Sequence, residues 1–168
     1  LSAGADGEAY LRLRLSLKPE IAPIQPIATN GLEITRFYQR VLPDGSTEPL
    51  GVPRVGDLIR VDLRVNLPRD DERYLVIEDR LPSVFEAINN SFASQAAPKA
   101  AGGTSESSWS ISHSEVRDDR VMFFFDRIYS SGTRTLTYLA RCTMAGKAYA
   151  PSAKVEAMYD PDHTALSA

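Results

Sequence analysis

The sequence predicts an all-β domain made of two packed antiparallel sheets, with at most one short helix. Hydrophobic and polar residues alternate with a period of two over many short stretches, and turn-forming residues separate these stretches. A sustained helical period is hard to find. A chain of 168 residues, 43% of them hydrophobic, is long enough to bury the core of such a domain without a metal or a disulfide.

The first alternating stretch lies near the amino terminus, where leucine occupies every second position from Leu11 to Leu17. It is followed by a proline-rich stretch with Pro19, Pro23 and Pro26, which is typical of an extended connector. We therefore expect residues 1–18 to provide a terminal strand of a preceding domain or an added edge strand. Residues 19–30 would be a connector, and residues 31–168 the β-sandwich domain.

The clearest alternation runs from Ile59 to Leu67 and ends at Pro68, which cannot donate to a strand ladder. Further strands are predicted at Glu33–Val41, Arg73–Asp79, Trp109–Arg117, Arg120–Ile128, Thr133–Thr143 and Lys154–Met158. The pair Asp118-Asp119 predicts a tight hairpin, and the strand after it extends the hairpin into a three-stranded meander.

Seven or eight short strands favour an immunoglobulin-like sandwich over a closed barrel. The one helix candidate is Ser83–Phe92, and the stretch Ser94–Ser108, rich in Ala, Ser and Gly, is predicted to be a long mobile loop. Much of the core between the sheets is expected to come from Trp109, Ile111, Val121, Phe123, Phe125, Leu136, Tyr138 and Ala140.

The charge balance argues against two classes of partner. Nineteen basic against twenty-two acidic residues give a net charge of -3, which provides no basic field for nucleic acid or acidic lipid.

The longest unbroken apolar runs, Val121–Phe125 and Tyr74–Ile77, are far shorter than the roughly 20 residues that cross a bilayer. Leu1–Glu8 lacks the features of a signal peptide. Because the chain does not begin with Met, we expect it to be a piece of a longer protein.

Catalytic candidates are few. His113 lies within Ser112-His113-Ser114, but neighbours along a strand point to opposite faces, and the sequence has no nucleophile-elbow motif. A surface or partly buried histidine is the favoured interpretation. Cys142 shares a strand face with Leu136, Tyr138 and Ala140, which indicates a small core residue rather than a reactive thiol.

Metal and phosphate sites find little support either. The pairs Asp70-Asp71 and Asp118-Asp119 lack the spacing of a calcium loop and are interpreted as turns. Asp160, Asp162 and His163 could hold a cation, although a solvated tail is the favoured interpretation. We expect no metal, no cofactor and no enzyme. A small hydrolase stays possible only if His113 lies near a serine and a carboxylate in a cleft.

The carboxyl half contains, in order, the segments Tyr74–Pro82, Phe85–Asn89, Glu115–Val121, Tyr138–Arg141 and Ala150–Pro161. This ordered set resembles the C-terminal, tenth macroglobulin-like domain of bacterial alpha-2-macroglobulins. Upstream, Gly31–Arg36 is similar to the entry of that domain, and Tyr10–Leu17 to the end of the CUB-type domain that precedes it. Two stretches depart from the family pattern, namely Met144-Ala145-Gly146 and the tail His163–Ala168.

The resemblance implies a domain of a large extracytoplasmic protease trap (endopeptidase inhibitor), periplasmic or in the cell envelope, whose parent can be lipid-anchored. In this family a protease cuts a bait region, and a thioester in another domain then couples to the protease. The resemblance implies that this domain packs on the thioester and CUB-type domains of the same parent chain, and that proteases are partners of the full-length protein. Cys142 is not the thioester cysteine.

The resemblance also assigns a role to Met158 and Tyr159, which match a Met-Tyr pair that covers the thioester in the family. The residues alone suggest instead that the pair ends a last strand and fills this domain's own core. A generic immunoglobulin-like interaction or carbohydrate-binding module of a cell-surface protein stays open as well. An exposed aromatic row around Tyr38, Tyr74 or Tyr149 would favour that alternative.

Overall fold

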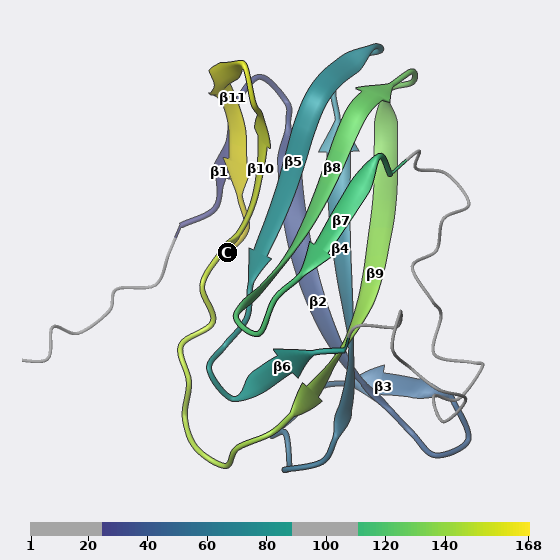
Figure 1. Cartoon of the computed structure of the whole chain (residues 1–168), viewed down its shortest axis with the longest axis vertical. Helices are drawn as coiled ribbons and strands as arrows, with labels where there is room; N and C mark the ends of the chain where they lie inside the picture. Colours follow the sequence, from purple (N-terminus) through teal and green to yellow (C-terminus); the bar gives the residue numbers. More distant parts are fainter. Residues whose placement is uncertain (1–24, 89–110) are drawn as a thin grey trace, which may run out of the picture.

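The computed structural model describes residues 25–88 and 111–168. Within these ranges the chain forms strands and turns without a helix, arranged as two antiparallel sheets packed face to face (Figure 1). The predicted all-β sandwich is confirmed. The described ranges hold no helix long and apolar enough to span a bilayer. The predicted strand at Leu11–Leu17 and the predicted loop Ser94–Ser108 lie outside the described residues.

Every neighbouring pair of strands in both sheets is antiparallel. The six-stranded sheet has the order β1 (Ile27–Ala28), β11 (Asp160–Leu166), β10 (Ala153–Ala157), β5 (Glu72–Arg80), β8 (Arg120–Ile128) and β7 (His113–Val116). The five-stranded sheet has the order β3 (Thr47–Pro49), β2 (Glu33–Val41), β4 (Leu58–Leu67), β9 (Gly132–Cys142) and β6 (Phe85–Ala87). The residues of β1 belong to the end of the predicted connector and pair with β11.

The period of two determines which side chains enter the core. In β4 the aliphatic residues from Ile59 to Leu67 are buried, and the polar residues between them face outward. The strand lies between β2 and β9, so both of its edges are hydrogen-bonded. The predicted bounds of β2 and β8 coincide with the observed ones, and those of β4, β5, β9 and β10 differ by at most one residue at each end. The predicted hairpin at Asp118-Asp119 joins β7 to β8, but the predicted three-stranded meander is wrong, because β9 lies in the other sheet.

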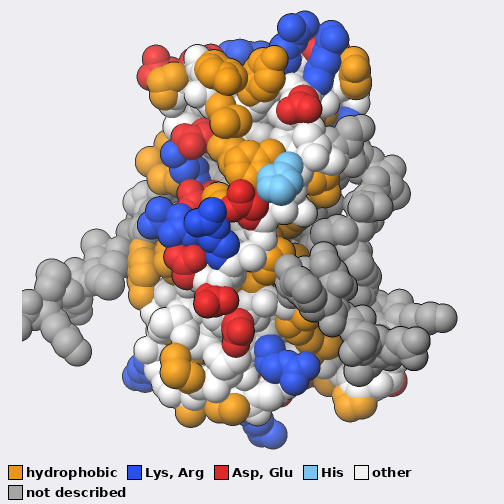
Figure 2. Space-filling view, in the orientation of Figure 1, with side chains coloured by type: hydrophobic (Ala, Val, Ile, Leu, Met, Phe, Trp, Pro, Cys, Tyr) orange, Lys and Arg blue, Asp and Glu red, His pale blue; other side chains and the backbone are white. Residues whose placement is uncertain are grey.

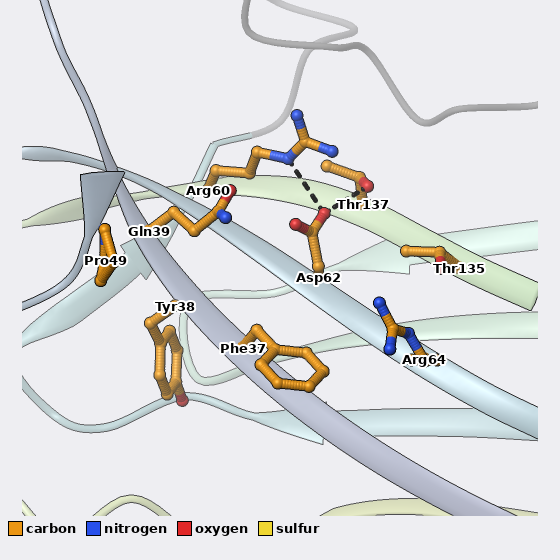
Figure 3. Close-up of a pocket in the computed structure, with 9 residues that line it drawn as sticks. All are labelled: Phe37, Tyr38, Gln39, Pro49, Arg60, Asp62, Arg64, Thr135 and Thr137. Carbon is orange, nitrogen blue, oxygen red and sulfur yellow. Dashed lines mark hydrogen bonds and ion pairs between the residues drawn. The ribbon is translucent and has the colours of Figure 1, made fainter. Parts of the chain in front are cut away.

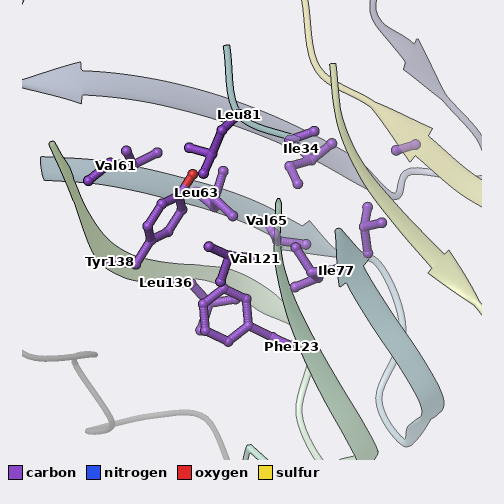
Figure 4. Close-up of a cluster of buried hydrophobic side chains, with 14 of the residues drawn as sticks. Ile34, Val61, Leu63, Val65, Ile77, Leu81, Val121, Phe123, Leu136 and Tyr138 are labelled. Carbon is purple, nitrogen blue, oxygen red and sulfur yellow. The ribbon is translucent and has the colours of Figure 1, made fainter. Parts of the chain in front are cut away.

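The core lies between the sheets, where side chains of β4 and β9 meet those of β5 and β8 (Figure 4). Burying one large aliphatic or aromatic side chain contributes roughly 1.5–3 kcal/mol. Six of the predicted core residues are buried, namely Val121, Phe123, Phe125, Leu136, Tyr138 and Ala140. Ile111 is partly buried against the core, and Trp109 lies outside the described residues.

The predicted helix at Ser83–Phe92 is wrong over its described part. Phe85–Ala87 forms β6, which pairs with the end of β9, while residues 89–92 lie outside the described ranges. The Phe85 ring is buried and packs edge-on against Tyr38, with ring centroids 5.8 Å apart. Burial and ladder hydrogen bonds therefore outweigh the weak local helix pattern.

The solvated tail is also wrong. Asp160–Leu166 forms β11, and His163, Ala165 and Ser167 point inward while the residues between them stay more exposed. Ser167 is fixed beyond the strand end, because its amide donates to the carbonyl of Ala153. The inward positions carry small or polar side chains, and for this reason the alternation does not appear as a hydrophobic pattern.

A buried charged cluster joins the two sheets through the core. Arg36 of β2 donates to Asp79 of β5, and both side chains are almost fully buried. Tyr138 of β9 donates its hydroxyl to the other Asp79 oxygen over 2.6 Å, and Arg36 also donates to the carbonyl of Pro151 over 2.6 Å. Burial raises the pKa of Asp79, and the Arg36 charge opposes that rise. The cluster thus satisfies its buried charges internally while it connects both layers.

Candidate interdomain docking surface

Met158 and Tyr159 form the two-residue turn between β10 and β11, because Ala157 pairs with Asp160. Their exposed fractions are 52% and 79%. The interpretation that this pair fills the domain's own core is therefore wrong. Two large apolar or aromatic residues stand in a hairpin turn, a place where Gly, Asn and Asp are usual.

Tyr74, near the start of β5, lies beside this turn. Its carbonyl accepts a hydrogen bond from the Met158 amide over 2.8 Å. Its ring meets the Tyr159 ring edge to face, with centroids 5.1 Å apart and an interplanar angle of 87°. We call Tyr74, Met158 and Tyr159 the hairpin-tip patch. Figure 2 shows hydrophobic side chains gathered at this upper end of the molecule.

Paired charges border the patch. Asp71 accepts hydrogen bonds from Arg127 and, over 2.9 Å, from Arg73, and these bonds hold the pKa of Asp71 below its usual value. The Arg127 guanidinium lies over the exposed Tyr129 ring, 4.7 Å from its centroid. Asp70 accepts a hydrogen bond from the Ser131 amide. These bonds fix the turn before β5, as expected for Asp70-Asp71.

A buried pair supports the patch from inside. The Nε2 of His163 lies 3.1 Å from Oε1 of Glu72, and both residues are buried. Glu72 begins β5 and His163 belongs to β11, so the pair bridges across β10, whose Ala157 is small. His163 points away from Asp160 and Asp162, which are exposed. The possible cation site is not formed, and the described residues contain no cluster able to hold a metal ion.

Replacing Glu72 with alanine is expected to lower the free energy of unfolding by about 2 kcal/mol, because the buried His163 ring loses its partner. Glu72→Gln, which keeps an acceptor oxygen for His163, is the matched control and should lose less than about 1 kcal/mol. Urea unfolding of both variants measures the difference. Equal losses in the two variants would contradict a specific role for this hydrogen bond.

The other sequence candidates do not form a catalytic site. His113 is exposed, and its Nε2 lies 3.6 Å from Glu115. In the described part of the chain no hydrogen bond joins His113 to a serine; the nearby Ser112 hydroxyl accepts from the Asp126 amide. Cys142 is buried and free, as predicted for a core residue.

A groove of about 600 Å³ crosses the outer face of the five-stranded sheet (Figure 3). Arg60 and Thr137 both donate to Asp62, over 3.0 and 2.6 Å. The Arg64 guanidinium lies over the Phe37 ring, 5.3 Å from its centroid. The Asp62 carboxylate is thus paired within the groove, and the Arg64 guanidinium lies against an aromatic ring.

The exposed aromatic row that would favour a carbohydrate-binding module is not formed by Tyr38, Tyr74 and Tyr149. Tyr38 is half-buried against Phe85, Tyr74 belongs to the hairpin-tip patch, and Tyr149 lies in the connection between β9 and β10. Three rings on three separate elements offer no continuous platform for a sugar chain.

Comparison with known proteins decides the family. Residues 31–162 match the family described as "Bacterial Alpha-2-macroglobulin MG10 domain". The chain belongs to this family. Alpha-2-macroglobulins are non-catalytic, which agrees with the prediction that this macroglobulin domain is not an enzyme. The match begins at Gly31, the predicted start of the sandwich, although β1 precedes it in the structure.

Curated relatives include an alpha-2-macroglobulin homolog of Yersinia pestis, 28% identical over 163 residues, which cover 88% of this chain and 8% of that protein. A homolog of Nostoc sp. is 29% identical over 170 residues, covering 96% of this chain and 9% of that protein. This macroglobulin domain therefore spans less than a tenth of the length of either relative.

Solved structures agree with the family. The crystal structure of native Escherichia coli alpha-2-macroglobulin from domain MG7 to the C-terminus matches with a TM-score of 0.69 and 31% identity, over 89% of this chain and 24% of that one. The E. coli protein activated by porcine elastase matches with a TM-score of 0.70 and 31% identity, over 89% and 13%. Salmonella alpha-2-macroglobulin reacted with methylamine matches with a TM-score of 0.68 and 29% identity, over 89% and 9%.

Proposed function

We propose that the chain is the C-terminal domain of a protease-trapping bacterial alpha-2-macroglobulin, in which Met158 and Tyr159 cover the thioester of a neighbouring domain. One observation carries the proposal: the two residues that match the family's Met-Tyr pair stand at an exposed hairpin turn, 52% and 79% exposed. Burying side chains of this kind against a partner surface is favourable, because it removes apolar area from water.

The chemistry of the patch suits this role. A thioester survives only where water is excluded from its carbonyl carbon. The flexible thioether of Met158 can fill an irregular gap, and the flat ring of Tyr159 covers a large area with little loss of conformational freedom. The domain therefore acts as a passive cover, and any bond to the protease forms elsewhere in the parent chain.

The same proposal sets the partners and the compartment. The partners are the thioester and CUB-type domains of the parent, and proteases meet the full-length protein. The location is extracytoplasmic, in the periplasm or at the cell envelope. Support comes from two related alpha-2-macroglobulins. The E. coli protein is activated by elastase, and the Salmonella protein has been reacted with methylamine, a small nucleophile able to open a thioester.

The test is the lifetime of the thioester in the resting full-length protein. The double variant Met158→Ser/Tyr159→Ser is expected to lose its thioester at least about tenfold faster, which corresponds to removing ~1.4 kcal/mol of protection. Labelling of the released thiol over time measures the rate.

The chain offers a matched control. Met144 and Tyr149 are also exposed, at 55% and 40%, but lie in the connection between β9 and β10. Met144→Ser/Tyr149→Ser should keep the wild-type lifetime. A wild-type lifetime in the Met158→Ser/Tyr159→Ser variant would refute the shielding role.

A further inference from the structure

We infer that Tyr74 is a positioning residue for the thioester cover: its left-handed backbone and its ring hold Met158 and Tyr159 in place before the domain docks. The inference rests on the proposed function. It adds a residue from a different strand to a cover that the sequence placed entirely on the Met158–Tyr159 turn.

The backbone of Tyr74 is the first observation. Its φ is +52°, in the left-handed region that a bulky residue seldom adopts, and such a conformation persists only where the surroundings impose it. Tyr74 is absent from the residue pairs of β5 and β8, although Arg73 and Leu75 on either side of it are paired. Its carbonyl instead accepts the Met158 amide over 2.8 Å.

The left-handed residue also changes which side chains of β5 point inward. Leu75, Ile77 and Asp79 are buried at alternate positions, and continuing that period would bury Arg73. Instead Arg73 is exposed and Glu72 is buried, where it meets His163 of β11. The same residue therefore lets Glu72 of β5 reach His163 of β11 across β10 beneath the turn, and it joins the turn to β5 through its carbonyl.

The Tyr74 ring is the third observation. It is 48% exposed, so it contributes little to the core, yet its ring lies edge to face against Tyr159, with centroids 5.1 Å apart. A flexible exposed tyrosine must be ordered when it binds, and a contact formed beforehand reduces that ordering cost. Strain, hydrogen bond and ring contact all converge on the two residues that the proposed function uses.

Two variants of Tyr74 test the ring while both leave the left-handed backbone available. Asn tolerates a left-handed backbone but has no ring, whereas Phe keeps the ring. Tyr74→Asn is expected to speed thioester loss in the full-length protein by about threefold to tenfold, because the favourable contact of one aromatic pair is lost. Tyr74→Phe should leave the rate unchanged.

A second readout does not depend on the thioester. In NMR spectra of the 168-residue chain, the Tyr159 ring signals should move in Tyr74→Asn and stay near wild type in Tyr74→Phe, while the urea midpoint of both variants stays within error of wild type. A purely structural role would lower the midpoint of Tyr74→Asn and is thereby distinguished.

The outcomes separate this inference from the proposed function. If Met158→Ser/Tyr159→Ser keeps the wild-type thioester lifetime, the proposed function fails. If that variant loses its thioester quickly while Tyr74→Asn does not, the proposed function stands and the inference about Tyr74 fails. Unmoved Tyr159 signals in Tyr74→Asn would overturn the inference independently.

Discussion

Replacing Arg36 with alanine is expected to lower the free energy of unfolding by about 3–5 kcal/mol, because it leaves the Asp79 carboxylate buried without its counter-charge. The side chains of Arg36 and Asp79 are 3% and 0% exposed, so water cannot replace the lost partner. The Tyr138 hydroxyl still donates to Asp79 but carries no charge. Urea unfolding of the 168-residue chain measures the loss.

The loss should depend on pH in a defined direction. Burial raises the pKa of Asp79 in the folded protein, and removing the opposing Arg36 charge raises it further. A carboxyl with a raised folded pKa binds its proton more tightly in the folded state, which favours folding below the unfolded pKa of about 4. The deficit of Arg36→Ala is therefore smallest in acid and grows as the pH rises through the folded pKa.

A double variant provides the control. Arg36→Met combined with Asp79→Asn removes both charges. The side-chain oxygen of the introduced asparagine can still accept the Tyr138 hydroxyl, so the double variant should recover most of the lost stability. A loss below about 1 kcal/mol in Arg36→Ala, or one that does not change with pH, would contradict the account of a buried, mutually dependent ion pair.

Replacing Phe123 with alanine is expected to cost about 3–5 kcal/mol of unfolding free energy, through lost burial and the cavity that remains. Phe123 is 2% exposed and belongs to β8, and its ring centroid lies 6.5 Å from that of Tyr138 on the opposite sheet. Since a domain is typically stable by only about 5–15 kcal/mol, this variant should lose much of its margin.

The next residue supplies the control for Phe123. Phe124 faces outward on the same strand, where its ring lies 5.7 Å from that of His113. Phe124→Ala should cost less than about 1 kcal/mol, as is usual for partly exposed positions. Similar losses at positions 123 and 124 in urea unfolding would mean that the alternation in β8 does not decide which ring supports the core.

The alternation of apolar and polar residues was sufficient to predict the central strands. In β4 and β8 the inward positions carry large aliphatic or aromatic side chains, so the burial pattern can be seen directly in the residue types. The sandwich follows from several such strands that must cover one another's apolar faces.

Two strands could not be predicted from the residue types, for physical reasons. In β11 the inward positions are His163, Ala165 and Ser167, which do not look like a core, and β6 has only three residues. Arg36 stands at an inward position of β2, between the buried Ile34 and the half-buried Tyr38, and a charge at such a position was a usable signal for a buried partner. Its partner Asp79 lies on another strand, so spacing alone does not pair them.

The candidate site divides in the same way. Met158 and Tyr159 were found only through the resemblance, because apolar residues at a strand end ordinarily indicate burial. Tyr74 was not found as part of the site, since a left-handed φ leaves no mark on the residue type. The Glu72–His163 pair follows from that local conformation and was equally out of reach.

The single cysteine of the chain, Cys142, is the last residue of β9. Cys142 is 2% exposed and pairs in register with Phe85 of β6. Thiols react with oxidants and with other cysteines only when solvent reaches the sulfur. In an oxidising compartment, Cys142 is therefore protected from disulfide formation while β6 stays paired with β9. Its oxidation would require this edge of the sandwich to open.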